Sequence, residues 1–356
     1  MNYAIIGCGR ISSNNIQAAI NNKLNVVALC DIIEDRALEK KSLFHLDNTK
    51  IYTDYKKMLA EEQLDLVTIA TESGKHAQIA IDCINAGVNV IIEKPIALSL
   101  ADADRIIEAG KKNNVKVCAC HQNRFNKSIQ KIRKAIEDGS FGKLLHGAAH
   151  IRWARDKQYY DQAPWRGTWD QDGGALMNQC IHNIDLLRWM MGNDIVEVMA
   201  YTDKLKHDYI EAEDLGLAIV KFANGSYGLI EGTVNVYPKN LEETLYIFGE
   251  KGTVKAGGKS VNKLETWQFE DNDEDSAYVL EHYSENPANV YGFGHTPLYA
   301  DMIDAINSDR APYVDAYAGK RALELVLAIY KSANDGKAIQ LPLKECASTD
   351  FKGRFD

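Results

Sequence analysis

Residues 1–12, MNYAIIGCGRIS, decide the fold of the first part of the chain. The apolar run from Tyr3 to Gly7 predicts a strand buried on both faces of a parallel sheet. Gly7-Cys8-Gly9 follows directly and opens a helical pattern. The first glycine permits a tight turn, and the second lets the backbone approach a pyrophosphate at the positive end of the next helix. Ser12 takes the third position of this fingerprint, where a small residue still permits close packing.

Four more apolar runs repeat the strand pattern, at Val26–Cys30, Leu66–Ala70, Asn89–Glu93 and Lys116–Cys120. Helical patterns lie between them. In residues 76–86, Ala77, Ala80, Ile81 and Ile84 share one face, and Gly87 is the expected helix stop. Ser99 and Asp102 form a capping box before the next helix. This alternation predicts a doubly wound α/β Rossmann domain over residues 1–120.

The pattern changes after residue 120, where a helix near 128–137 precedes a series of strands. The predicted strands are Leu144–Trp153, Ile195–Thr202, Leu215–Phe222, Ser226–Thr233, Thr244–Phe248 and Thr253–Lys255. Asn224-Gly225 is a strong hairpin signal between two of them. Helices near 297–306 and 316–332 follow, and the acidic residues 270–290 predict a surface loop. We therefore expect residues 121–356 to form an α+β domain with a large, open, mostly antiparallel sheet.

Composition excludes several classes of protein. The net charge of −9 disfavours nucleic acid as a partner. Runs of about 18 apolar residues are missing, which predicts no membrane span. The seven cysteines are odd in number and several fall in apolar patterns, so we expect reduced thiols. The first residues lack the features of a signal peptide, and together these signs predict a cytoplasmic protein.

Asp31 ends the second apolar run, where an acidic residue usually binds the adenosine ribose hydroxyls of a dinucleotide. The same carboxylate would repel the 2′-phosphate of NADP. Ile32 and Ile33 follow it, and Arg36 is the nearest basic residue. The sequence therefore predicts NAD as the cofactor.

Glu93-Lys94-Pro95 follows the fourth apolar run and places Lys94 at the carboxyl end of the sheet, where ligands bind in such folds. There a lysine can orient a hydroxyl and stabilise a developing alkoxide. The competing interpretation is a solvated surface lysine.

Asn178, His182 and Asp185 are spaced four and three apart, so on a helix they share a face. An imidazole can accept the proton of an alcohol near neutral pH. The alternative is a structural histidine, which is the commoner role in a helix. A zinc site at Cys118, Cys120 and His121 is a weaker hypothesis, because alternate residues of a strand point to opposite faces. We predict no metal.

Gly7-Cys8-Gly9, Glu93-Lys94-Pro95 and Gly173-Gly174 followed by His182, in this order and spacing, resemble the glucose-fructose oxidoreductase/inositol dehydrogenase (Gfo/Idh/MocA) family over nearly the whole chain. The resemblance implies an NAD-dependent dehydrogenase acting on a CH–OH group, with Lys94, His182 and Asn178 as the catalytic residues. It also implies a homo-oligomer, a dimer or homotetramer, assembled through the open sheet. The implied cofactor contacts are Gly7, Gly9, Arg10, Ile11, Asp31, Thr71, Ser73, His76, Glu93, Lys94 and Gln122.

A narrower likeness lies in residues 71–76, 122–126, 159–162, 165–169 and 177–179. These segments resemble the branch that oxidises the 3-hydroxyl of UDP-N-acetylglucosaminuronate on the route to lipopolysaccharide and other surface polysaccharides. Many family members carry Asp where this chain has Asn178, and asparagine is the residue of that branch. The implied substrate contacts are Lys94, Arg124, Tyr159, Arg166, Thr168, Asn178 and His182. Arg166 and Thr168 suit a carboxylate or phosphate.

Three questions stay open at this point. Lys94 and His182 both qualify as the base that takes the hydroxyl proton. The substrate of a different branch, inositol or a free sugar, would suit the same motifs. An NAD-binding regulator without catalysis would use the same scaffold, although it needs neither Lys94 nor His182.

Overall fold

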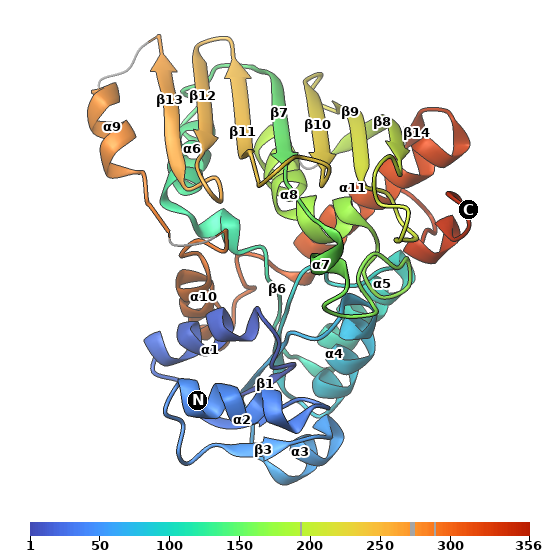
Figure 1. Cartoon of the computed structure of the whole chain (residues 1–356). Coiled ribbons are helices and arrows are strands. Elements are labelled where there is room, and N and C mark those ends of the chain that lie inside the picture. Colours follow the sequence, from blue (N-terminus) through green and yellow to red (C-terminus); the bar gives the residue numbers. More distant parts are fainter. Residues whose placement is uncertain (193, 271–274, 288–289) are drawn as a thin grey trace. The chain divides into compact units, whose positions relative to one another are not determined.

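The computed structural model describes residues 1–192, 194–270, 275–287 and 290–356 (Figure 1). The chain forms two compact units, one of residues 1–121 with 294–320 and the other of residues 122–293 with 321–356. The first boundary lies one residue from the predicted one. The predicted second domain, residues 121–356, is not one continuous unit, because residues 294–320 return to the first unit.

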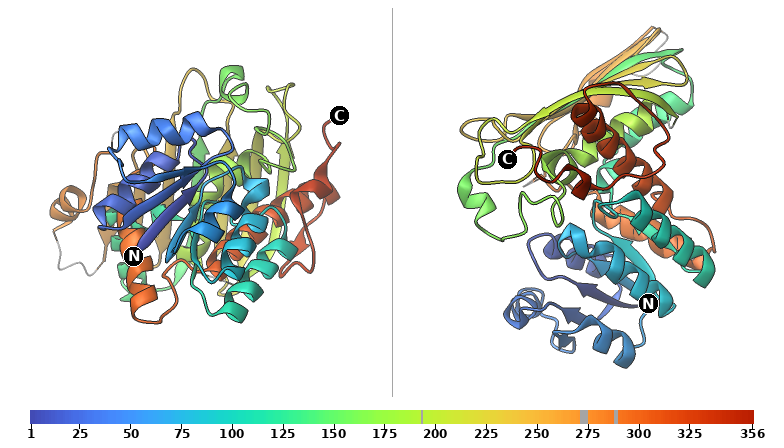
Figure 2. Two further views of the ribbon diagram at one scale, coloured as in Figure 1. Left: turned by 90° about the horizontal axis from the view of Figure 1, so that it is seen from below. Right: turned by 90° about the vertical axis from the view of Figure 1, so that its right-hand side faces the viewer.

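The first unit is built on a six-stranded sheet in the order β3-β2-β1-β4-β5-β6, with every pair parallel. Its strands are β1 (Asn2–Ile6), β2 (Asn25–Cys30), β3 (Lys50–Tyr52), β4 (Leu66–Ile69), β5 (Asn89–Ile92) and β6 (Val117–Ala119). Its helices are α1 (Ser12–Asn21), α2 (Glu34–Leu43), α3 (Tyr55–Glu61), α4 (His76–Asn85), α5 (Leu100–Asn113) and α10 (His295–Asn307). Figure 2 shows helices on both faces of this sheet, which is the predicted Rossmann architecture.

Local signals in this unit set the helix ends as predicted. The Ser99 hydroxyl accepts a hydrogen bond from the Asp102 backbone and caps α5. Gly87, with φ of +80°, follows the end of α4. The buried face of α4 differs from the prediction, since Ile79 and Cys83 are buried and Ile81 is only half-buried. The reason is that α4 packs against α5 as well as the sheet, which widens and rotates its buried stripe.

A buried hydrogen-bond cluster explains why residues 294–320 belong to the first unit. The Tyr299 hydroxyl, on α10, lies 2.6 Å from the Thr68 hydroxyl and 3.0 Å from the Tyr3 hydroxyl, and it donates to Asn15 at 2.8 Å. Tyr299 and Tyr3 are fully buried, and α10 packs along α1. These contacts join residues up to almost 300 positions apart in the chain. A local sequence pattern therefore cannot predict them.

The second unit is built on an eight-stranded sheet in the order β13-β12-β11-β7-β10-β9-β8-β14. Its strands are β7 (Leu144–Arg152), β8 (Ile195–Asp203), β9 (Leu215–Phe222), β10 (Tyr227–Thr233), β11 (Glu242–Gly249), β12 (Gly252–Gly257), β13 (Lys263–Phe269) and β14 (Ile339–Gln340). Among the described strands of this second sheet, only β7 and β10 pair in parallel. The sheet is therefore mixed but mostly antiparallel, as predicted.

The two faces of this sheet differ. Helix α8 (Ile181–Met191) packs on β7, β10 and β11. Alternate side chains of β9 and β10 point to the opposite face of the sheet. They include Leu217, Ile219, Tyr227 and Leu229, which are 43–56% exposed. The unit also contains α6 (Lys127–Glu137), α7 (Lys157–Tyr160), α9 (Ser276–His282) and α11 (Ala316–Asp335) from residue 321 onward, since residues 316–320 of α11 belong to the first unit. An open, partly apolar sheet face is thus present, and its use in an oligomer stays a prediction.

Other expectations have mixed outcomes. Helix α9 lies inside the segment expected to contain a surface loop, while residues 271–274 and 288–289 lie outside the described residues. All seven cysteines are free and buried, as predicted. No helix in the described part of the chain is both long and apolar enough to span a bilayer.

Candidate active site

Steric contact shapes the glycine turn after β1. Gly7 has φ of +97°, and a Cβ there would lie 2.5 Å from the carbonyl carbon of Ala70. Conformation and space therefore both require glycine. At Gly9, no described atom lies within 4 Å of the Cβ position, so its backbone faces open space. The Ser12 hydroxyl donates to the Gly9 carbonyl at 2.6 Å and closes the turn onto α1. This arrangement leaves a helix start accessible to a phosphate.

Asp31 follows β2 and is tied to the same turn. One carboxylate oxygen accepts a hydrogen bond from the Cys8 backbone at 2.8 Å, and the other accepts one from the Ile33 backbone at 2.8 Å. Each oxygen can accept a second bond, so the carboxylate can still bind ribose hydroxyls. Arg36, the nearest basic residue in the sequence, is exposed on α2.

His76 joins the loops that follow β4 and β5. Its Nδ1 lies 2.7 Å from the Pro95 carbonyl oxygen, and its Nε2 lies 3.1 Å from the Thr71 carbonyl oxygen. Burial lowers the pKa of His76, which favours the neutral ring. The predicted cofactor residue His76 is thus a buried link beneath the loops. Of the other predicted contacts, Arg10 is exposed, Ile11 and Thr71 are half-buried, and Ser73 is buried.

The residue before Lys94 is a buried anchor. The Glu93 carboxylate accepts a hydrogen bond from the Asn15 amide at 2.8 Å and lies 3.7 Å from His295 Nε2. The Lys94 backbone donates to the same carboxylate at 3.3 Å. Burial raises the pKa of Glu93, but His295 and Asn15 outweigh this and bring the pKa to about 2. The ionised Glu93 therefore fixes the backbone from which Lys94 extends.

One group of described residues has ligand atoms close enough together to suggest a metal. The ligand atoms of Glu93, Cys120 and His295 lie within 4.8 Å of one another. Ligand atoms around tetrahedral zinc are about 3.5 Å apart, and the Glu93 carboxylate is already bound by Asn15. Cys118 and His121 do not belong to this group. The absence of a metal stays a prediction.

In the second unit, Asn178 and His182 lie on one continuous helical segment. A π-helical turn, Leu176–Cys180, carries Asn178 and runs into α8, which carries His182. Such turns are rare and frequently mark functional sites. Both side chains are half-buried. The Gln122 amide nitrogen lies 3.4 Å from His182 Nε2, so Gln122, a predicted cofactor contact, lies beside one of the two candidates for the base.

Asp185 faces the interior of the unit, away from the role that its helical spacing suggested. It accepts two hydrogen bonds from Arg124, at 2.6 and 2.7 Å, and both side chains are buried. The Arg124 guanidinium also lies 4.8 Å from the Trp189 ring centroid. Because Asp185 already holds Arg124, we leave Arg124 out of the proposed substrate site.

A buried carboxyl group holds the glycine pair that precedes the π-helical turn. Glu213 accepts hydrogen bonds from the Leu176 backbone at 2.7 Å and the Tyr330 hydroxyl at 2.8 Å. A Cβ at Gly174 would lie 2.1 Å from the other Glu213 oxygen, which explains the glycine. Burial raises the pKa of Glu213 to about 8, so the group is neutral at pH 7.

A second buried carboxylate ties Asn178 to the preceding loop. Asp172 accepts hydrogen bonds from the Asn178 amide and from the Gly167 backbone, the latter at 2.7 Å. In the same loop the Thr168 hydroxyl donates to the Trp165 carbonyl at 2.7 Å. The predicted substrate residue Thr168 therefore already uses its proton within the loop, and its oxygen lone pairs are what it can offer a donor.

Tyr159 and Arg166 meet beside the π-helical turn. The Tyr159 hydroxyl accepts hydrogen bonds from Arg166 at 2.5 Å and from the Gln179 amide at 2.7 Å. Gln179 is the neighbour of Asn178 in the turn. Three predicted substrate residues, Tyr159, Arg166 and Asn178, are therefore gathered in one part of this unit.

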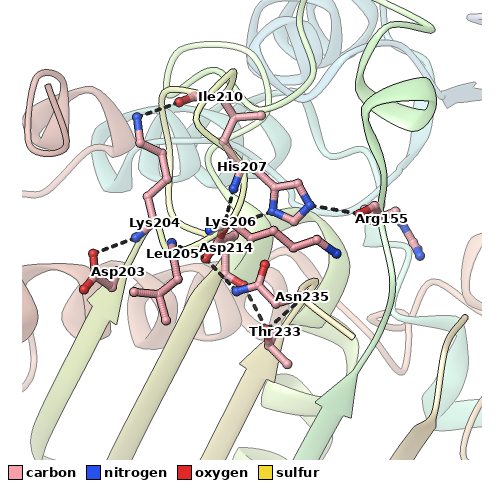
Figure 3. A network of polar contacts seen from close by, with 10 residues as sticks. All are labelled: Arg155, Asp203, Lys204, Leu205, Lys206, His207, Ile210, Asp214, Thr233 and Asn235. Carbon is pink, nitrogen blue, oxygen red and sulfur yellow. Dashed lines mark hydrogen bonds and ion pairs between the residues drawn. The ribbon is translucent and has the colours of Figure 1, made fainter. Parts of the chain in front are cut away.

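Figure 3 shows the polar network that supports this region, with Asp214 at its centre. His207 Nδ1 lies 3.0 Å from the Asp214 carboxylate, and its Nε2 lies 2.9 Å from the Arg155 carbonyl oxygen. Further donors to the same carboxylate are the backbone N–H groups of Leu205, Lys206 and His207 and the amide of Asn235. Burial raises the pKa of Asp214, but the His207 and backbone bonds lower it well below its ordinary range.

Four residues of this region were not predicted as site residues: Arg155, Asp172, Gln179 and Glu213. Gln179 lies inside a quoted motif, next to Asn178, and its adjacency was the one available signal. Glu213 comes from a stretch of the chain that no motif distinguishes. Its role appears only when the chain brings it 37 positions back to Leu176.

These features define an NAD-dependent oxidoreductase with a Rossmann unit. Residues 1–121 match the model of the oxidoreductase family NAD-binding Rossmann fold, and residues 133–341 match that of the family's C-terminal α/β domain. The protein therefore belongs to the Gfo/Idh/MocA oxidoreductase family, and NAD(H) is its cofactor.

Individual relatives narrow the comparison. The WlbA dehydrogenase from Bordetella pertussis, solved in complex with NADH and UDP-GlcNAcA, is 37% identical, with 97% of this chain and 98% of that chain covered and a TM-score of 0.90. The WlbA dehydrogenase from Chromobacterium violaceum, in the same type of complex, is 35% identical, with coverage of 97% and 96% and a TM-score of 0.88. The myo-inositol 2-dehydrogenase of Thermotoga maritima is 28% identical, covering 96% of this chain and 98% of the relative.

Proposed function

We propose that this protein oxidises the 3-hydroxyl of a UDP-N-acetylglucosaminuronate-type nucleotide sugar to the 3-keto sugar. The observation that carries the proposal is the likeness to two WlbA dehydrogenases in complex with UDP-GlcNAcA, at 35–37% identity over nearly the whole chain. The gathering of Tyr159, Arg166 and Asn178 in one part of the second unit supports it. The product would serve the synthesis of surface polysaccharide precursors.

The proposed chemistry moves one hydride and one proton. The C-3 hydride passes to the nicotinamide of NAD, and the hydroxyl proton passes to Lys94 or His182. The Glu93 anchor sets the backbone of Lys94, and Gln122 can donate to the unprotonated Nε2 of His182, the form of the ring that accepts a proton. Arg166, with the Asn178 amide, would bind the anionic part of the substrate. Thr168, whose hydroxyl proton is used within the loop, would accept a hydrogen bond from a substrate hydroxyl instead.

Assembly and location belong to the same proposal. The exposed apolar side chains of β9 and β10 offer a surface that a second copy could cover. We propose a dimer or homotetramer assembled through this face, in the cytoplasm. Light scattering of the purified protein and of a variant with Ile219→Lys would test the assembly.

The substrate is tested by comparing three compounds with NAD: UDP-N-acetylglucosaminuronate, UDP-N-acetylglucosamine and myo-inositol. Alcohol oxidation by NAD can stop early, so NADH formation is followed in a single turnover or with a ketone trap. We expect the UDP-uronate to be oxidised with the highest kcat/KM and the product to be the 3-ketone by NMR. Higher activity on the UDP-hexose, which lacks the sugar carboxylate, would contradict the role of Arg166 in binding that carboxylate.

A second candidate is inositol oxidation. The likeness to the myo-inositol 2-dehydrogenase over the whole chain favours it, although the identity of 28% is lower. Activity on inositol alone would establish this candidate and leave the cofactor and the catalytic residues unchanged.

A further inference from the structure

Two guanidinium groups share one aromatic ring in the second unit. The guanidinium carbons of Arg155 and Arg166 lie 4.9 and 4.3 Å from the centroid of the Tyr159 ring. Both arginines are half-buried, and within the described part of the chain neither forms an ion pair with a carboxylate. Two partly desolvated cations at one ring are unfavourable unless an anion joins them.

The arginines also retain unused donors. Arg155 donates to the Gln179 and Asn240 side chains, at 2.6 and 3.1 Å, and to the Ala154 carbonyl. Arg166 donates to the Tyr159 hydroxyl. A guanidinium has five N–H groups, and both Nε atoms are buried without a partner among the described residues. The cluster therefore offers more charged donors than the protein itself satisfies.

The position of Arg155 is fixed before any ligand arrives. Its backbone N–H donates to the Val234 carbonyl at 3.0 Å, and its carbonyl oxygen lies 2.9 Å from His207 Nε2 (Figure 3). The Asp214 carboxylate holds His207 in turn. At the far end of the side chain, Gln179 accepts a hydrogen bond from the Arg155 guanidinium and donates one to the Tyr159 hydroxyl. The Tyr159 hydroxyl also accepts from Arg166, so Gln179 and Tyr159 link the two arginines. Preorganised donors of this kind lose little entropy on binding.

We propose that Arg155 is a second substrate-binding arginine, which forms with Arg166 one subsite for an anionic group of the substrate. The proposal rests on the proposed function and deepens it. A nucleotide-sugar acid carries two groups of suitable chemistry, the sugar carboxylate and the diphosphate, and a guanidinium can bind either through paired N–H donors. Gln179 follows Asn178 directly, which places the subsite beside the proposed sugar-binding residue.

The experiment measures kcat/KM for UDP-N-acetylglucosaminuronate and UDP-N-acetylglucosamine with Arg155→Met, Arg166→Met and the double variant. Each single variant should lose about 10- to 100-fold, the range for a charged hydrogen bond. The double variant should lose less than the product of the two, because both arginines hold one group. Arg105→Met on α5, an exposed arginine paired with Asp102, is the matched control and should lose nothing.

Comparison of the two substrates shows which anionic group of the substrate the two arginines bind. A loss confined to the uronate assigns the carboxylate, and an equal loss on both assigns the diphosphate. Melting temperature and NADH binding check each fold, and Arg155→Gln replaces Arg155→Met if the latter does not fold. Unchanged kcat/KM on both substrates overturns the Arg155 inference alone. A wild-type protein that oxidises neither UDP sugar overturns the proposed function instead.

Discussion

The glycine turn of the first unit and the start of the α8 segment in the second unit are both proposed to serve one reaction, yet they are built differently. In the turn, Gly7, Ser12 and Asp31 act within about one βαβ unit, and each contact joins neighbouring strands or the helix between them. At the α8 segment, Asp172 comes from the preceding loop, but the other supporting groups, Glu213 and Tyr330, come from distant parts of the chain.

The difference shows how each region can fail. The turn depends on backbone conformation and close approach, so a single added Cβ at Gly7 would displace it. The α8 segment depends on buried polar groups whose cost of desolvation is met only when all partners are present. Substitutions of residues far away in the sequence should therefore disturb the structure of the α8 segment more than that of the glycine turn.

The sharpest test asks whether each of the two units supplies a group that moves a proton, Lys94 in the first and His182 in the second. Lys94→Met and His182→Asn should each lower turnover by about 10²–10⁴-fold, the range for a general acid or base. Single-turnover NADH formation with the UDP-uronate measures this, and unchanged NADH binding and melting temperature show that the fold is intact. Near-wild-type turnover in both variants would remove the pair from the reaction.

A second test compares buried and exposed arginine pairs. Arg124→Met removes the guanidinium that binds the buried Asp185 carboxylate. The substitution should lower the free energy of unfolding by about 3 kcal/mol. Arg105→Met, which breaks an exposed pair, should cost under about 1 kcal/mol. Denaturant unfolding gives both values. A stable Arg124→Met protein with a raised KM would return Arg124 to the substrate site.

A third test uses the pH dependence of Glu213. The pKa of this carboxyl is about 8 in the folded protein and 4.5 in the unfolded chain. At any pH between these two pKa values, folding is therefore coupled to the uptake of a proton by Glu213. The free energy of unfolding should thus fall as pH rises, by roughly 2 kcal/mol between pH 6 and 8 from this group. Glu213→Gln imitates the neutral form, and its unfolding curve should lack that part of the slope. Identical slopes for the two proteins would contradict the buried, neutral carboxyl.

The smallest effect concerns the first region alone. Wild-type kcat/KM should favour NAD over NADP by about 10-fold or more, because Asp31 repels a 2′-phosphate. Asp31→Asn should narrow the ratio of the two efficiencies, and the exposed Arg36 on α2 is a nearby cation for the 2′-phosphate of NADP. Equal efficiency with both cofactors in the wild-type protein would refute the assignment of Asp31.

The predictions from sequence were most accurate where a pattern is local. The strands β1, β2, β4 and β5 and the hairpin at Asn224-Gly225 lie within one residue of expectation, because apolar runs and turn residues act over short distances. Three strands were not predicted: β3, β13 and β14. β13 alternates Lys263 and Glu265 with buried residues at the edge of its sheet, and β3 and β14 are only three and two residues long.

The sequence by itself determined the Rossmann unit, the glycine turn at Gly7 with Asp31 beside it, and the positions of Lys94 after a strand and of Asn178 and His182 on a helix. These follow from backbone conformation and periodicity, which neighbouring residues specify. Only the tertiary structure decided that residues 294–320 return to the first unit, that Asp185 holds Arg124, and that Glu213 supports Gly174. These contacts join buried polar groups distant in the chain, and their free energy depends on exclusion of water that no local pattern records.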